Sequence, residues 1–261
     1  MTTEAPILVT GGTGTLGRLL VPRLQAAGRA VRVLSRTAHE PANGVEYVSG
    51  DLTTGEGIDA AVDGVEVIVH AAGASKGDEH TTATLVRAAE RAGVRHLVYI
   101  SVVGADRVPV VSGVDRAMFG YIASKRAAER VIAESRVPWT TLRATQFHEL
   151  SLTTARAMTK LPVVPVPSGF SIQPVDGAEV ADRLTELALG PPAGLVPALA
   201  GPRVYGFAEL VRSYAKARGK HRALVPLRLP GKAARAFRDG ANLAPDRAVG
   251  RRTWEDFLVA D

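Results

Sequence analysis

A tyrosine and a lysine, Tyr121 and Lys125, stand four residues apart in a segment with helical character. Four residues make about one helical turn, so both side chains would lie on one face of a helix. A free tyrosine phenol has a pKa of about 10, and a neighbouring cation stabilises its phenolate. We therefore expect Tyr121 to exchange a proton with a substrate oxygen while Lys125 lowers its pKa.

A glycine-rich run follows the short apolar segment 6–10 and precedes a stretch with apolar residues at helical spacing. Between a strand and a helix, such glycines let backbone N–H groups reach a pyrophosphate, and the helix N-terminus adds partial positive charge. The sequence therefore predicts a dinucleotide site. The residues expected to contact the coenzyme here are Gly11, Thr13, Gly14, Thr15, Leu16 and Gly17.

The end of the second expected strand bears on which coenzyme is bound. NAD sites usually carry an acidic residue there, about 20 residues after the glycines, to hold the ribose 2′-hydroxyl. This chain has Ser35 and Arg36 instead, and no acid between Glu4 and Glu40. A guanidinium and a hydroxyl can bind a 2′-phosphate. We therefore predict NADP(H) over NAD(H).

Apolar runs alternate with amphipathic stretches through the first 145 residues. The order strand–helix–strand, repeated, predicts right-handed crossovers and a parallel sheet, and the glycine loop favours the Rossmann order over a closed barrel or a flavodoxin-like sheet. The strands are expected at 6–10, 31–34, 45–49, 65–70, 96–102 and 139–142, and the helices at 16–27, 81–92 and 120–135.

Beyond residue 145 the alternation becomes irregular, with proline-rich stretches at 162–174 and 190–202 that we interpret as loops. Helices are expected at 176–189, 207–218 and 232–240. The predicted fold class is thus α/β, a doubly wound Rossmann sheet over residues 1–147 with a small C-terminal substrate lobe over 148–261. Apolar residues in 161–174 and 224–240 would wall the substrate pocket.

The composition limits the class of protein and the cellular compartment to be expected. The 261 residues are 46% hydrophobic and 22% charged, which supports a sizeable core, and the lack of cysteine excludes disulfides and thiolate sites. No apolar run is long enough to span a bilayer and no signal peptide is evident, so we expect a cytoplasmic protein without a membrane partner. No histidine pair has ligand spacing, so no metal is expected.

The net charge of +6 is concentrated near the C-terminus, where residues 203–252 hold 13 Lys and Arg against three Asp and Glu. We interpret this excess as solvated helix faces. Aromatic residues are only 5%, and no nucleic-acid motif accompanies the charges, so we do not expect a nucleic-acid partner.

The chain resembles the short-chain dehydrogenase/reductase superfamily. The features that carry this resemblance are the glycine loop, Arg36, the segments after the expected strands and the Tyr121–Lys125 pair. Within this superfamily, the chain is most similar to the atypical NmrA-like branch, over about residues 5–150. The resemblance implies that Lys125 also binds the nicotinamide ribose, and it allows a homodimer.

Further coenzyme contacts are implied by the same resemblance. Asp51 would hydrogen-bond the adenine with Leu52 beside it, and Ala71, Ala72 and Gly73 would line the adenosine ribose. Ala144, Thr145 and Phe147 would lie near the nicotinamide. His70 stands where asparagine is frequent in these relatives, and we expect only a local hydrogen bond from it.

Ser101 follows the fifth expected strand, where the superfamily usually supplies a hydroxyl that holds the substrate oxygen. In extended members that hydroxyl often comes a residue or two later, where valines stand here. Ser101 is therefore either the third catalytic residue or a structural one tied to backbone or cofactor.

The function expected is an NADPH-dependent oxidoreductase acting on a small apolar carbonyl or quinone-like substrate. One alternative is a redox-sensing regulator that binds NADP(H) without turnover, as some relatives in this branch do. Another is an epimerase, dehydratase or cyclase of the same superfamily.

Overall fold

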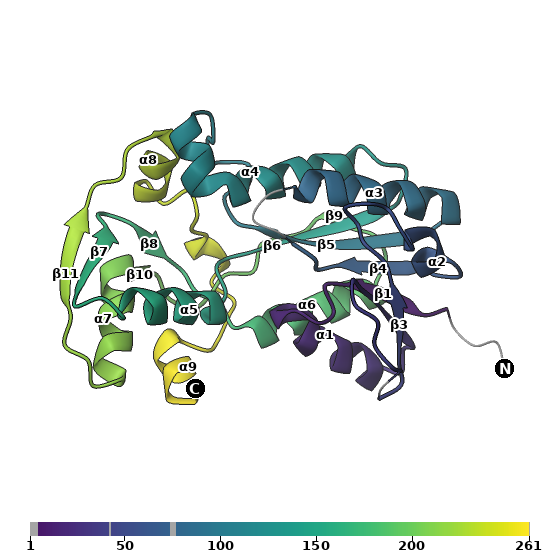
Figure 1. The fold of residues 1–261 in the computed structure, drawn as a ribbon, viewed down its shortest axis with the longest axis horizontal. Coiled ribbons are helices and arrows are strands. Elements are labelled where there is room, and N and C mark those ends of the chain that lie inside the picture. The colour runs from purple at the N-terminus through teal and green to yellow at the C-terminus, as the bar shows by residue number, and fades with distance from the viewer. Residues whose placement is uncertain (1–4, 42, 74–76, 261) are drawn as a thin grey trace. The chain divides into compact units, whose positions relative to one another are not determined.

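The computed structural model describes residues 5–41, 43–73 and 77–260. Within them, seven strands form one parallel sheet (Figure 1). In spatial order these are β3 (Val45–Ser49), β2 (Val31–Ser35), β1 (Ile7–Thr10), β4 (Val67–His70), β5 (His96–Val102), β6 (Trp139–Ala144) and β9 (Gly194–Leu195). The first six follow the Rossmann order 3-2-1-4-5-6, which confirms the predicted fold class.

Helices cover both faces of this sheet (Figure 1). On one face lie α1 (Thr15–Ala26) and α6 (Gly177–Leu189), and on the other lie α3 (Asp78–Ala92) and the C-terminal half of α4 (Gly113–Ala133). The short helix α2 (Ile58–Val62) packs on α3. Because both faces are covered, Ile7, Leu8 and Val9 of β1 are all 0% exposed, as expected for a central parallel strand.

The register of the strands brings three loops to one edge of the sheet. Thr10, the last residue of β1, pairs with Leu34 of β2 on one side and with His70 of β4 on the other. The three strands therefore end level with one another. The loops that begin at Gly11, Arg36 and Ala71 leave from the same carboxyl edge, which is where open α/β sheets bind ligands.

Two compact units divide the chain, each built from three segments. The first unit comprises residues 1–101, 124–142 and 178–196, and the second comprises 102–123, 143–177 and 197–261. This differs from the single boundary expected at residue 147. The chain returns to the sheet after that point, because α6 covers it and β9 pairs with β6 through Thr140 and Gly194.

The second unit has its own core around two small sheets. Its elements are α5 (His148–Met158), β7 (Val163–Pro167), β8 (Ser171–Ile172), β10 (Tyr205–Gly206), α7 (Phe207–Ala217), β11 (Ala223–Leu227), α8 (Lys232–Arg238), the 3-10 helix η1 (Pro245–Arg247) and α9 (Trp254–Ala260). β7 pairs with β11 in parallel, and β8 pairs with β10 in antiparallel. Trp254 of α9 is fully buried in the core that α5, α7 and β7 share.

Several elements differ from the sequence expectation. The loops expected at 162–174 and 190–202 contain strands β7, β8 and β9, and α4 begins at Gly113 rather than 120. Helices α2, α5 and α9 and strands β10 and β11 were not foreseen. Prolines are tolerated in β7 because it lies at the edge of a two-stranded sheet. The helix α4 is kinked at Phe119, whose φ and ψ are −126° and 17°, so its first half is a separate helical stretch. None of the described helices is both long and apolar enough to cross a bilayer.

Candidate functional site

The glycine loop between β1 and α1 leaves no room for side chains at two positions. Gly11 adopts a left-handed conformation (φ 73°), and a β-carbon there would lie 2.6 Å from the backbone nitrogen of Ala72. A β-carbon on Gly17 would overlap the carbonyl oxygen of Gly11. These glycines are therefore required for the tight turn and for the close packing of α1 on the loop.

The first turn of α1 is open to an anion. Its N-cap, Gly14, makes no side-chain hydrogen bond, and no acidic residue lies in the first turn. Thr13, Gly14 and Thr15 are exposed while Leu16 is buried beneath them, and Nε of Arg18 donates a hydrogen bond to the Thr13 carbonyl at 2.9 Å. The partial positive charge and N–H groups of this helix end fit the pyrophosphate of a dinucleotide.

The ends of β2 and β3 carry the residues expected around the adenosine. Arg36 is exposed, and the buried Ser35 hydroxyl accepts a hydrogen bond from the Thr37 N–H at 3.2 Å. Oδ1 of Asp51 accepts one from the Thr53 N–H at 2.7 Å. That bond lowers the pKa of the Asp51 carboxyl, and the positive charge of Arg36 lowers it further. Arg36 and Asp51 thus lie within electrostatic reach of one another, and Leu52 beside them is buried.

At the end of β4, backbone bonds join the expected ribose-lining turn to β1. The Ala71 N–H donates to the Thr10 carbonyl at 3.1 Å, and the Ala72 N–H donates to the Thr10 hydroxyl at 3.3 Å. Gly73 follows, exposed, and a β-carbon on it would lie 3.1 Å from Nζ of Lys125. This turn therefore lies directly beside the glycine loop and the lysine.

His70 forms the local hydrogen bonds expected of it. Its Nδ1 lies 2.6 Å from the Thr10 hydroxyl oxygen, and its Nε2 lies 3.1 Å from that of Thr82. Burial lowers the pKa of His70 to about 3, and the charge of Lys125 adds to this effect. The imidazole is therefore neutral and links β1, β4 and α3.

Lys125 is buried, only 3% exposed, and its charge is balanced inside the protein. Its Nζ lies 3.2 Å from Oδ2 of Asp78, whose side chain is 2% exposed. The ammonium also donates to the Ile100 carbonyl at 3.4 Å and lies 4.9 Å from the centre of the Tyr99 ring. Burial lowers the pKa of Lys125, and Asp78 opposes that shift. The carboxylate therefore favours the charged lysine.

Tyr121 and Ser101 differ in exposure. The Tyr121 side chain, one turn before Lys125 on α4, is 42% exposed. Ser101, near the end of β5, is 4% exposed, and its Oγ has no hydrogen-bond partner among the described residues. No hydrogen bond from this hydroxyl to the backbone of the described residues is therefore observed. A buried polar atom without a partner costs free energy unless a ligand or water satisfies it.

The residues expected near the nicotinamide lie at the end of β6 and directly after it, and Ala144 and Thr145 are held by backbone hydrogen bonds. The Ala144 carbonyl accepts from the Val103 N–H at 2.9 Å, and the Thr145 N–H donates to the Leu199 carbonyl at 3.1 Å. The Thr145 hydroxyl accepts from the Gly201 N–H at 3.3 Å. Both Ala144 and Thr145 are buried.

Asp78 is the residue of this site that the sequence does not reveal. An acid at the start of a helix is common, because it interacts favourably with the helix N-terminus. Its neighbour Glu79 fits the same pattern and is exposed. Which of the two turns inward toward Lys125 depends on the packing of α3 against the sheet, and spacing alone does not indicate it.

A parallel sheet of this order, with a glycine loop and an open helix end at the carboxyl edge of β1, defines a dinucleotide-binding Rossmann protein. Comparison with known families agrees, because residues 11–188 match the NAD(P)H-binding family. The chain belongs to that family.

Several known proteins are similar to this chain. It is 32% identical over 184 residues to the (4-alkanoyl-5-oxo-2,5-dihydrofuran-3-yl)methyl phosphate reductase of Streptomyces griseus, covering 67% of this chain and 61% of the relative. It is 30% identical to the ceramide reductase of Caulobacter vibrioides, covering 86% and 74%. The chain thus spans less than two thirds of the first relative's length.

Among solved structures, the NADPH complex of the NADPH-dependent quinone oxidoreductase from Escherichia coli has the same fold. The TM-score is 0.80 at 20% identity, over 97% of this chain and 99% of that one.

Proposed function

We propose that this protein is an NADPH-dependent oxidoreductase of short-chain dehydrogenase/reductase type that reduces a small apolar carbonyl or quinone-like substrate. The observation that carries the proposal is the buried Lys125, paired with Asp78, one helical turn from the exposed phenol of Tyr121. A buried cation next to an accessible phenol is the arrangement that a tyrosine acid needs. Membership in the NAD(P)H-binding family and relatives named as reductases support it.

In this proposal the coenzyme, when bound, supplies the hydride. Tyr121 donates its phenol proton to the substrate oxygen as negative charge develops there, and the Lys125 ammonium stabilises the phenolate left behind. Asp78 favours the protonated form of Lys125 and holds it in place, because burial alone disfavours the ammonium. Lys125 would also hold the nicotinamide ribose.

The coenzyme would lie along the carboxyl edge of the sheet. The backbone of residues 11–17 would bind the pyrophosphate, and Arg36 with Ser35 would bind the 2′-phosphate. Asp51 and Leu52 would flank the adenine, Ala71, Ala72 and Gly73 the adenosine ribose, and Ala144 and Thr145 the nicotinamide. The absence of an acid at the end of β2 supports the preference for NADPH, since a carboxylate there would repel the extra phosphate.

Ser101 remains our candidate for a third catalytic residue. Its buried hydroxyl has no protein partner among the described residues, which is the state of a group that awaits a substrate or coenzyme oxygen. The alternative, a hydroxyl tied to the backbone, has no supporting hydrogen bond in the same part of the chain.

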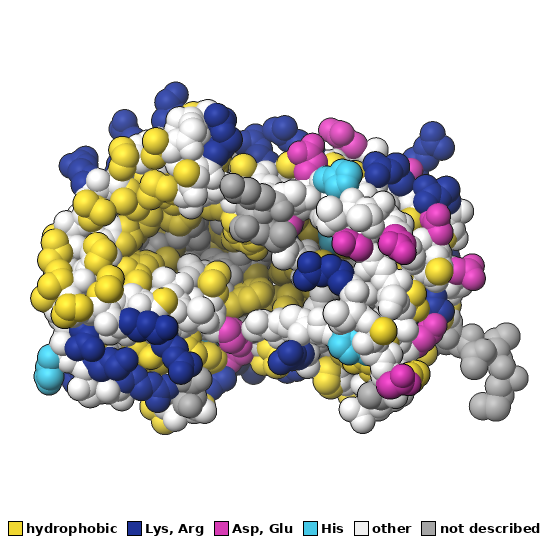
Figure 2. All heavy atoms as spheres, in the orientation of Figure 1, with side chains coloured by type: hydrophobic (Ala, Val, Ile, Leu, Met, Phe, Trp, Pro, Cys, Tyr) yellow, Lys and Arg dark blue, Asp and Glu magenta, His cyan; other side chains and the backbone are white. Residues whose placement is uncertain are grey.

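Exposed apolar side chains around Tyr121 support an apolar substrate. Val114 and Met118 lie one turn apart in the first stretch of α4 and are 48% and 43% exposed, and Tyr121, after the kink, is 42% exposed. Behind them Phe119 packs against Phe170 and Phe237, with ring centres 6.2 and 4.9 Å away. Figure 2 shows further hydrophobic side chains over β7, β11 and α8 of the same unit. Exposed apolar groups gathered in this way mark binding surfaces.

The test is NADPH oxidation, followed by absorbance, against a panel of quinones and aromatic carbonyls. The wild type should oxidise NADPH with at least one acceptor. Tyr121→Phe should lower kcat by about 100-fold or more, because general acid catalysis contributes about that much, while NADPH affinity stays unchanged.

Tyr47→Phe is the matched control. Tyr47 lies on β3, packs against His39 and is not among the residues proposed to bind the coenzyme or to act on the substrate, so this variant should keep full turnover. Full turnover by Tyr121→Phe would contradict the role of the phenol. Tight NADPH binding without turnover on any acceptor would favour a redox-sensing regulator instead.

A further inference from the structure

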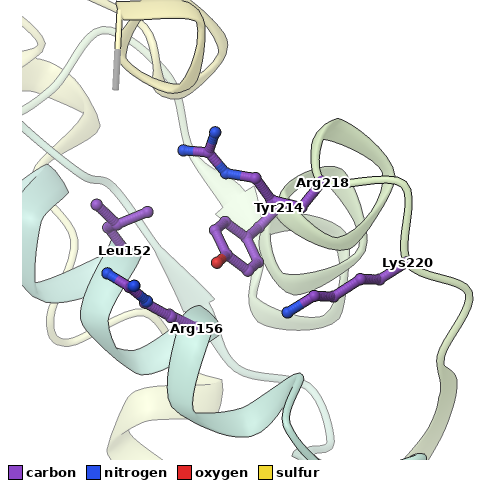
Figure 3. Close-up of a pocket in the computed structure, with 5 residues that line it drawn as sticks. All are labelled: Leu152, Arg156, Tyr214, Arg218 and Lys220. Carbon is purple, nitrogen blue, oxygen red and sulfur yellow. The ribbon is translucent and has the colours of Figure 1, made fainter.

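A hollow lies between α5 and α7, wholly within the second unit. It has a volume of about 390 Å³ and is lined by Leu152, Arg156, Tyr214, Arg218 and Lys220 (Figure 3). No residue of the proposed coenzyme or catalytic site is among these five. Three of them are cationic and none is acidic.

Local structure explains why these side chains converge. Leu152 and Arg156 are one turn apart on α5, and Tyr214 and Arg218 are one turn apart on α7, so each pair shares a helix face. Gly219 then adopts a left-handed conformation (φ 63°). The Gly219 N–H donates to the Lys216 carbonyl and the Lys220 N–H to the Ala215 carbonyl, which is a Schellman end. This turn brings Lys220 back toward α5.

The side chains that line the hollow include several hydrogen-bond donors. In Figure 3 the Lys220 side chain extends from the end of α7 toward α5, the Tyr214 hydroxyl faces the same gap, and the Arg156 side chain extends along α5 toward Leu152. The guanidinium of Arg218 lies 5.9 Å from the centre of the Tyr214 ring. Within the described residues, neither Arg156 nor Lys220 forms an ion pair with an acid. Like charges held together without a counter-ion repel one another, and a bound anion removes that repulsion.

A helix C-terminus favours positive residues, and this effect alone accounts for a cation in the last turn of either helix. It does not account for cations from two helices around a shared hollow, with a phenol at its centre. The surrounding surface adds to the positive potential, because Lys160, Lys216 and Arg222 flank the hollow in sequence and are exposed or half-buried. Figure 2 shows Lys and Arg side chains gathered over this part of the unit.

We propose that the hollow between α5 and α7 is a binding site for a small phosphorylated molecule. Arg156 and Lys220 would bind the phosphoryl oxygens with charge-assisted hydrogen bonds, and the Tyr214 hydroxyl would donate a third. Leu152 and the Tyr214 ring supply an apolar wall for the group that carries the phosphate. The volume lies within the range of small-molecule sites. Part of the C-terminal basic excess thus has a specific role, beyond the solvated faces that the sequence suggests.

Isothermal titration calorimetry with phenyl phosphate and with inorganic phosphate, at constant ionic strength, tests the proposal. Phenyl phosphate should bind more tightly than inorganic phosphate, because its ring packs on Leu152 and Tyr214. The double variant Arg156→Gln/Lys220→Gln should weaken both by about tenfold or more, since each lost charge-assisted bond weakens binding by about that factor. Tyr214→Phe should weaken them less.

The matched control is Arg212→Gln/Lys216→Gln, which removes two exposed charges from α7 outside the hollow. It should weaken phosphate binding much less than the hollow variant does. Both double variants should keep the melting temperature of the wild type. An equal loss of affinity in both double variants would mean diffuse charge attraction and would overturn the proposal.

Three other results would also overturn it. One is no heat with either phosphate at millimolar concentration. Another is binding that survives Arg156→Gln/Lys220→Gln but is lost in Arg36→Gln, which would place the phosphate at the coenzyme loop. The third is binding of single-stranded oligonucleotides without binding of either small phosphate.

Discussion

At the scale of single residues, the buried pair of Lys125 and Asp78 is the feature on which the proposed chemistry depends. Two charges in a low-dielectric interior are stable only together. Their side chains are 3% and 2% exposed, and their charged atoms lie 3.2 Å apart. Burial lowers the pKa of Lys125 and Asp78 opposes that shift, so the carboxylate favours the protonated lysine.

Asp78→Asn should therefore change the pH dependence of turnover. Without the carboxylate the pKa of Lys125 falls, so the activity that requires a protonated lysine is lost at a lower pH. The alkaline limb of the kcat profile moves toward acid, and the free energy of unfolding drops by about 3–5 kcal/mol, because one buried charge is left unpaired. Both effects can be measured by kcat against pH and by denaturant unfolding.

Glu79→Gln is the control, because Glu79 is exposed in the same helical turn. It should change neither quantity. If Asp78→Asn proves too unstable to assay, the double variant Asp78→Asn/Lys125→Met removes both charges. It should recover stability without recovering turnover. An Asp78→Asn profile identical to that of the wild type would show that the carboxylate does not hold the proton on Lys125.

The sequence indicates candidate residues where the chemistry is local. Tyr121 and Lys125 stand out as candidates because they lie within one helical turn of each other, and the glycines of residues 11–17 because they are close together in the chain. Asp78 pairs across 47 positions, and the missing partner of the Ser101 hydroxyl depends on β5 and what surrounds it. Neither the Asp78–Lys125 pair nor the unpartnered Ser101 hydroxyl produces a sequence spacing from which it could be predicted.

At the scale of elements, the position of α1 relative to the glycine loop decides whether the helix end can reach a pyrophosphate. Gly17 lets the first turn of α1 contact the backbone of Gly11 and Gly12. A larger residue would push the helix away and break the packing that buries Leu16 and Leu20.

Gly17→Ala should therefore destabilise the protein by about 1–3 kcal/mol, as overpacking does, and should abolish measurable NADPH binding. Gly113→Ala is the control. A β-carbon at Gly113 meets no atom within 4 Å, and its φ is not left-handed, so stability and NADPH affinity should stay near the wild-type values. Wild-type NADPH affinity in Gly17→Ala would show that the close packing of α1 is not needed for binding.

The elements that the sequence predicts are those with strong periodicity and clear ends. The six central strands and the helices around them alternate regularly, and glycines such as Gly28 and Gly93 end two of the helices. The missed strands β7 and β9 are short and lie in proline-rich segments, and they form because a partner strand is available. The residue pattern within such a segment does not show whether a distant strand is available to pair with it.

At the scale of the whole molecule, buried histidines make stability depend on pH. His70 is neutral in the folded protein because its pKa is lowered from 6.5 to about 3. An unfolded chain takes up a proton at this histidine below about pH 6.5, which the folded chain does not. The stability that His70 contributes is therefore complete above that pH and is lost progressively as the pH falls toward 3.

His70→Asn should reveal this dependence. At about pH 7.5 the variant should be less stable than the wild type, since it loses hydrogen bonds to Thr10 and Thr82. At about pH 5 the difference in free energy of unfolding should be smaller by about 2 kcal/mol, because the variant has no imidazole to protonate on unfolding. Urea unfolding at both pH values measures it, and a difference that stays constant would contradict a neutral His70.

The division of the chain into two interleaved units also belongs to this scale. The boundary expected at residue 147 follows the change in sequence rhythm, whereas the sheet recruits α6 and β9 from beyond it. The sequence thus predicts the architecture of the first unit and misses which later segments complete it, because completion depends on pairing between distant strands.

The central claim is that the glycine loop binds a dinucleotide while Arg36 binds its 2′-phosphate. Calorimetric titration of the wild type and of Arg36→Gln with NADPH and NADH tests it most directly. The account predicts that the wild type binds NADPH at least about tenfold more tightly than NADH, and that Arg36→Gln abolishes this preference by weakening NADPH alone. No heat with either coenzyme, or tighter binding of NADH, would contradict it.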